Sequence, residues 1–68
     1  SLGGLIQELR RQISDRLLHL PSGSTQEIVL DVRGRGYSTD FLNKIVNYIK
    51  LNLADIYPDI PVTVLRYS

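Results

Sequence analysis

The chain of 68 residues contains no cysteine, tryptophan or methionine, and its only histidine is His19. Without cysteine, neither a disulfide nor a thiolate metal site can form within the chain. A zinc ion would depend on carboxylate ligands, so we expect no metal site. We also expect no cofactor, because the chain lacks both a complete dinucleotide-binding glycine pattern and a Gly-Lys-Ser/Thr phosphate loop.

A large excess of charge of one sign and long apolar runs are also missing. Eight lysines and arginines oppose seven acidic residues, for a formal net charge of +1. This balance creates no overall field that attracts a polyanion, so affinity for nucleic acid would need a local basic patch. No apolar stretch is long enough for a membrane span, and no signal-peptide pattern opens the chain. We expect a soluble, cytoplasmic domain without a membrane partner.

Residues 27–40 predict a strand, a glycine-containing basic turn and the start of a helix. Apolar side chains alternate with polar ones before the turn, at Ile28, Leu30 and Val32. This period of two indicates a half-buried strand over about residues 26–33. Gly34 and Gly36 permit positive φ in the turn. Ser38 or Thr39 then supplies a capping oxygen for the helix that follows.

Two amphipathic helices and a final short strand complete the pattern. The first apolar stripe, over residues 5–20, consists of Leu5, Ile6, Leu9, Ile13, Leu17 and Leu20. The second, in a helix over about 39–56, consists of Leu42, Ile45, Val46, Ile49, Leu53 and Ile56. Both follow the spacing of one helical face. Pro61 precedes an apolar, β-branched segment over residues 62–65, which predicts the last strand.

The order helix, strand, helix, strand predicts one small α/β domain over residues 1–68, with a parallel strand pair and two packed helices. Two strands alone are marginally stable. We therefore expect the sheet to be completed by another chain, either a second copy or a larger protein. Four apolar residues that fall outside the core patterns are candidates for this interface: Leu18, Val29, Tyr48 and Leu51.

A basic and aromatic cluster is expected where the two parallel strands end. Its members are Arg33, Arg35, Tyr37, Ser38, Arg66 and Tyr67. Carboxyl ends of parallel strands and helix N-termini favour anions, and guanidinium groups donate two hydrogen bonds to phosphate. The simpler interpretation is that the glycines shape the turn, a hydroxyl caps the helix and the arginines are solvated. The cluster contains no nucleophile–base pair, so it favours binding over catalysis.

His19 is the weak catalytic candidate. It lies one helical turn after Asp15, whose carboxylate could orient the imidazole as a general base. The simpler interpretation is an exposed histidine favoured by the helix dipole. Asp31 lies on the polar face of the first strand, where we expect it to be solvated or paired with an arginine rather than bound to a metal.

Residues 27–67 resemble the terminal segment of certain bacterial polymorphic and contact-dependent toxin domains. In these domains a strand ending in a similar DVRG leads through a polar turn into a helix and a last strand, as residues 31–34 do here. The resemblance implies a secreted effector that acts on RNA or DNA and is restrained by an immunity protein. It transfers no catalytic residue to this chain.

Two main functions are therefore expected in competition, and binding of a small anion or nucleotide is a third. The first is a protein-interaction and assembly module that self-associates or docks through its sheet edges. The second is a nucleic-acid-directed toxin module, or its C-terminal part, that acts through the basic and aromatic turn. If it is an enzyme, it is a metal-independent nuclease.

Overall fold

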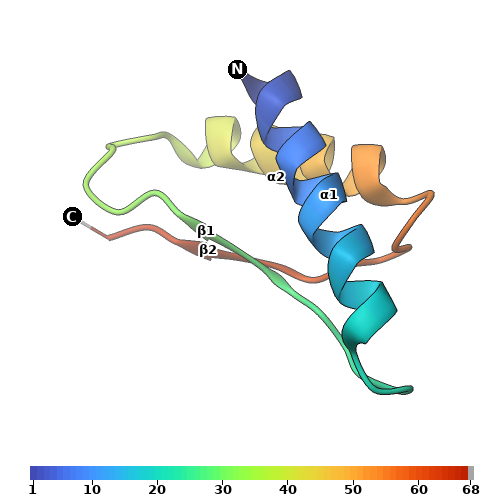
Figure 1. The fold of residues 1–68 in the computed structure, drawn as a ribbon. Coiled ribbons are helices and arrows are strands. Elements are labelled where there is room, and N and C mark those ends of the chain that lie inside the picture. Colours follow the sequence, from blue (N-terminus) through green and yellow to red (C-terminus); the bar gives the residue numbers. More distant parts are fainter. Residues whose placement is uncertain (68) are drawn as a thin grey trace.

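The structure, a computed structural model, describes residues 1–67. It contains helix α1 (Leu2–His19), strand β1 (Ile28–Asp31), helix α2 (Thr39–Leu53) and strand β2 (Val62–Leu65), as Figure 1 shows. The α-β-α-β order predicted from the sequence is confirmed, and the chain forms a small α/β fold.

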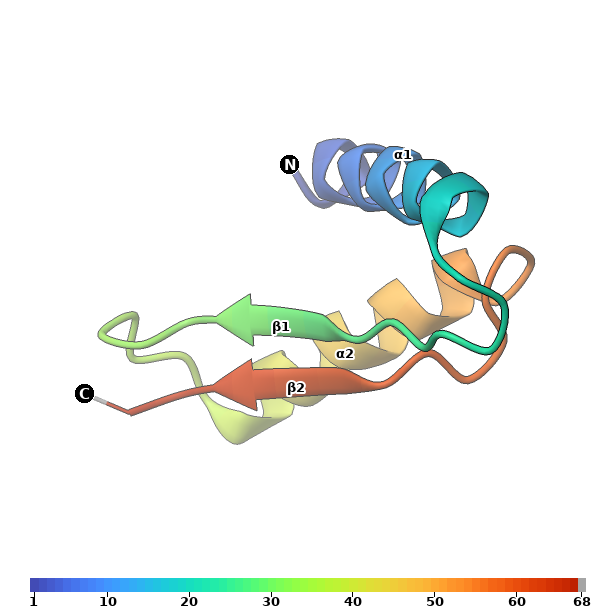
Figure 2. The same ribbon diagram turned by 60° about the horizontal axis from the view of Figure 1, so that its bottom comes forward.

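The two strands pair in parallel, as predicted. Ile28 lies opposite Val62, and this register continues to the ends of the strands. Hydrogen bonds extend the pairing further, because the Gly34 N–H donates to the carbonyl oxygen of Tyr67 at 3.1 Å. The carboxyl ends of β1 and β2 therefore lie side by side, and Figure 2 shows both strands pointing the same way.

The core lies between the helices and one face of the sheet. It consists of seven buried residues: Ile6, Ile13, Ile28, Ile45, Ile49, Leu53 and Ile60. In Figure 2, α2 lies behind both strands and α1 lies beyond β1. No helix or strand within residues 1–67 covers the opposite face, which carries the exposed Val29. We call this the open face of the sheet.

The predicted apolar stripe of the first helix is correct only in part. Ile6 and Ile13 are buried, whereas Leu17 and Leu20 are exposed. Leu17 lies in the last turn of α1 and Leu20 is the capping residue after it, so the buried part of the stripe ends before the helix does.

The first strand and the second helix are also shorter than predicted. β1 covers Ile28–Asp31 rather than 26–33, and α2 ends at Leu53 rather than at residue 56. After α2 the chain turns, because the N–H groups of Ile56 and Tyr57 both donate to the Leu53 carbonyl. The residues beyond Leu53 thus close the helix without extending it.

Arg10 connects the two helices in a way that the sequence pattern did not indicate. Its guanidinium donates to both carboxylate oxygens of Asp55, each at 2.8 Å, and to the carbonyl oxygen of Asn52 at 2.8 Å. The pKa of Asp55 is lowered, chiefly by this hydrogen bonding. The contact holds the middle of α1 against the end of α2.

Candidate functional site

The turn between β1 and α2 has the local structure that the sequence predicts. Gly34 and Gly36 have φ of 78° and 69°, in the left-handed region that favours glycine. Ser38 caps α2, since its Oγ accepts a hydrogen bond from the Phe41 N–H at 3.1 Å. The Ser38 hydroxyl therefore has a structural role.

The predicted basic and aromatic cluster is divided between the two faces of the sheet. Successive side chains along a strand point to opposite faces, and β1 and β2 lie in register. Arg33 and Tyr67 belong to the open face with Asp31, whereas Arg66 belongs to the face that α2 covers. Arg33 and Arg66, predicted in one binding cluster, therefore lie on opposite faces of the sheet.

On the open face, Arg33 is held by its neighbours. Its Nε and Nη2 atoms donate to the two carboxylate oxygens of Asp31 at 2.8 and 2.6 Å. Its Nη1 donates to the Tyr67 hydroxyl at 2.6 Å, and the guanidinium lies 5.3 Å from the centre of that ring. The ion pair offsets the charge of Arg33, which lowers its value for binding a polyanion.

The same contacts change the pKa values of the pair. Hydrogen bonds from the side chain and then the backbone of Arg33 lower the pKa of the Asp31 carboxyl to about 2. The pKa of Arg33 is raised, first by Asp31 and then by Tyr67. Asp31 is thus the arginine-paired carboxylate that the sequence suggested.

We expect this pair to make the stability of the fold depend on acid pH. Because the folded-state pKa of Asp31 is below its usual 3.8, its contribution is present above about pH 4 and is lost as the pH falls towards about 2. Asp31→Asn should lose less stability than the wild type over that interval. Urea unfolding at pH 7, 3 and 2 measures the difference.

A double-mutant cycle provides the control for this prediction. Arg33→Gln should reduce the acid sensitivity as Asp31→Asn does, and the double variant should add little because both changes remove one interaction. Equal acid sensitivity in the wild type and both single variants would contradict the assignment.

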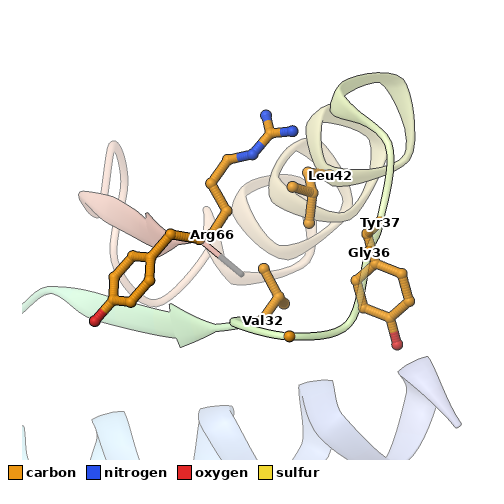
Figure 3. A pocket seen from close by; sticks show the side chains of 7 residues that line it. Val32, Gly36, Tyr37, Leu42 and Arg66 are labelled. Carbon is orange, nitrogen blue, oxygen red and sulfur yellow. The ribbon is translucent and has the colours of Figure 1, made fainter.

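A hollow of about 330 Å³ lies where the strands end and α2 begins. Its lining consists of Val32, Gly34, Gly36, Tyr37, Leu42, Arg66 and Tyr67. Figure 3 shows Arg66 and Tyr37 on opposite sides of it, with Val32 and Leu42 between them. The sequence pattern assigned Val32 and Leu42 to the core, so only their place beside the turn could have indicated this role.

Two side chains of the hollow are held by neighbours on α2. Arg66 Nη1 donates to the Thr39 hydroxyl at 2.9 Å. The Tyr37 and Phe41 rings meet edge to face, with 4.9 Å between their centres. Arg35, predicted in the same cluster, is exposed and does not line the hollow.

His19 takes no part in the Arg33 contacts or in the hollow. It ends α1, and Figure 1 places that end of α1 and the turn before α2 at opposite ends of the molecule. Asp15 accepts a hydrogen bond from Arg11 at 3.1 Å, and no bond between Asp15 and His19 occurs in the described part of the chain. The suggested general-base arrangement is therefore not formed.

The four predicted interface residues are all exposed and lie on three different elements. Leu18 is on α1, Val29 is on the open face, and Tyr48 and Leu51 are on α2. Leu18 and Leu51 are the most exposed of the four, at 80% and 77%.

Neither a membrane-spanning helix nor a cluster of metal ligands occurs in residues 1–67. Neither helix has the length and apolar character needed to cross a bilayer. No three histidine, aspartate or glutamate side chains of these residues gather in a way that could hold a metal ion.

Comparison with known proteins found no relative of this chain. No family model matches the chain, and no curated protein or solved structure matches it either. The toxin-domain resemblance therefore stays a hypothesis.

Proposed function

We propose that this chain is a protein-association module that extends its sheet with a strand from another molecule. The free edge of β2 carries this proposal. The Ile28 and Val32 N–H groups donate to the carbonyl oxygens of Pro61 and Leu65. In a parallel ladder, the backbone groups of the alternate residues on β2, Val62 and Val64, then point away from β1. An exposed row of such groups pairs readily with another strand.

The two edges of the sheet differ in their surroundings. Beside β1, residues of α1 and residues 26–29 enclose a hollow of about 280 Å³, so α1 flanks that edge. Beyond β2, Figure 2 shows no further strand, and the start of α2 passes behind the carboxyl end of β2. The β2 edge is therefore the more accessible of the two.

The composition of β2 fits a second copy as the partner. The segment Val62–Leu65 has the sequence VTVL and carries no charge. Two such strands can pair antiparallel around a two-fold axis without placing like charges opposite each other. β-Branched residues also fit the pleated surface of the longer sheet well.

The added strands would also meet a need of the fold. A sheet of two strands is marginal, and here its open face exposes 54% of Val29. A four-stranded sheet shared by two copies would satisfy the outward backbone groups. It would also make stability depend on protein concentration.

Light scattering across a hundredfold concentration range tests the proposal. We expect a mass of about twice 7.7 kDa at high concentration. Val64→Pro should shift the protein towards the monomer, because proline removes an outward N–H but no bond to β1. Val64→Thr is the matched control, since it also loses an apolar side chain but retains the N–H.

The outcomes separate self-association from the other possibilities. A monomer at every concentration would exclude a second copy as the partner. An assembly that persists in Val64→Pro but dissociates in Leu51→Asp would show that the exposed side of α2, rather than the sheet edge, forms the interface. Equal masses for the proline and threonine variants would contradict the role of the β2 edge.

A second candidate function is a nucleic-acid-directed toxin module. It is favoured by Arg35 and Arg66, which form no ion pair within residues 1–67.

We expect such a module to bind RNA with an affinity that falls as salt rises, and Arg35→Ala should reduce the salt dependence. Arg33→Ala should have a smaller effect, because Asp31 already offsets that charge. Filter binding at 50 and 200 mM salt measures this, and no retention at the lower salt would contradict the candidate.

A further inference from the structure

We propose that the hollow at the carboxyl ends of β1 and β2 binds a small phosphate monoester that carries a flat apolar group. The proposal does not depend on association through the β2 edge. A volume of about 330 Å³ is near the lower end of the range of small-molecule pockets, about 300–1,000 Å³. The hollow therefore suits a single ring with a short polar group.

The floor of the hollow is apolar and one wall is aromatic. Val32 and Leu42 form the floor and are buried, so their positions are set by the core. Tyr37 forms the wall and is partly exposed, while Phe41 holds its ring from the side. Figure 3 shows the Tyr37 ring beside these apolar side chains. A flat apolar group could pack on the floor and against this ring.

The charge of the hollow comes from Arg66. Its single side-chain hydrogen bond within residues 1–67 goes to the Thr39 hydroxyl, a neutral group. A guanidinium has five N–H donors, so four remain for a ligand. The contrast with Arg33 is clear, because Asp31 takes two donors of Arg33 and offsets its charge.

The mouth of the hollow is kept open by the turn. A Cβ atom added to Gly34 or Gly36 would meet no atom within 4 Å, so open space lies beside both residues. With Arg66 on one side and Tyr37 on the other, the hollow has a cationic end and an apolar end. A phosphate on a flat ring matches both, since guanidinium binds phosphate through paired hydrogen bonds.

Titration with phenyl phosphate, followed by NMR of the Val32 and Leu42 methyl groups, tests the proposal. We expect saturable shifts in the wild type and binding about tenfold weaker in Arg66→Gln, because a charge-assisted hydrogen bond is lost. Arg66→Lys retains the charge but loses the paired hydrogen bonds, so its affinity should fall between those of the wild type and Arg66→Gln. Arg35→Gln is the matched control, since it removes a charge from the same turn but not from the hollow.

Inorganic phosphate and phenol test the two ends of the hollow separately, and each should bind more weakly than phenyl phosphate. The proposal is overturned if phenyl phosphate causes no shifts, or if Arg66→Gln and Arg35→Gln weaken binding equally. It is also overturned if inorganic phosphate binds as tightly as phenyl phosphate, because the apolar floor would then contribute nothing. The dispersion of the methyl spectrum shows whether each variant is folded. If Arg66→Gln is unfolded, Arg66→Lys tests the hollow in its place.

Discussion

Replacing Ile49 with alanine should remove a large part of the stability of this domain. The side chain is 0% exposed and belongs to the one buried apolar cluster of residues 1–67. Truncation of a buried isoleucine costs about 2–5 kcal/mol, because apolar burial is lost and a cavity remains. A chain of this length has roughly 3–10 kcal/mol in total. Urea unfolding followed by circular dichroism at low protein concentration measures the loss.

Leu51→Ala is the matched control on the same helix. Leu51 is 77% exposed, so its truncation should change the free energy of unfolding by less than about 0.5 kcal/mol. If both variants lost the same stability, α2 would not present the face to the core that the structure shows.

Gly34→Ala should have the largest effect among the turn residues. Gly34 has a φ of 78°, and an added Cβ would meet no atom within 4 Å. The cost therefore comes from the backbone alone, and the left-handed conformation costs an L-residue about 1–2 kcal/mol. The variant should unfold at a lower urea concentration, and it should also weaken the bond from the Gly34 N–H to Tyr67.

Gly3→Ala is a control for which we expect the opposite effect on stability. Gly3 lies within α1, and the nearest atom to an added Cβ is Ser1 Oγ at 4.0 Å, an ordinary contact. Alanine in a helix is favoured over glycine by roughly 0.5–1 kcal/mol, so this variant should be more stable than the wild type. A loss of stability in both glycine variants would show that the effect at Gly34 is not specific to its φ.

Several local features could be predicted because they depend on short stretches of sequence. The alternation of Ile28, Leu30 and Val32 predicted β1, since the period of a strand is visible in adjacent residues. Gly34 and Gly36 predicted the turn for the same reason, and Ser38 predicted the start of α2. Each rests on backbone preferences that act within a few residues.

Other features could not be predicted because they depend on the distance between elements. Leu17 matched the helical stripe of α1, yet it is exposed. Nothing in the sequence around Asp55 indicated that Arg10, 45 residues earlier, would bind it. Helical periodicity shows which side of a helix is apolar, but it does not show how far the partner surface extends.

The candidate site also combines features that the sequence predicted with features that it did not. The residues at the ends of both strands were identified from the sequence, and their approach to one another followed from the parallel topology. Which residues share a face depended on the register, which places Arg33 opposite Tyr67 and sends Arg66 to the side of α2. A shift of one residue would exchange the faces, and short apolar strands do not encode that choice strongly.

The sequence alone determined the order of the elements, the parallel strands and the capped glycine turn, because these follow from local preferences and chain connectivity. The ion pair between Asp31 and Arg33 is local as well, because residues two apart on an extended segment share a face. The tertiary structure decided the surroundings of Arg66. Thr39 lies 27 residues before it in the sequence, and only the packing of α2 against the end of β2 brings the two side chains together beside the hollow.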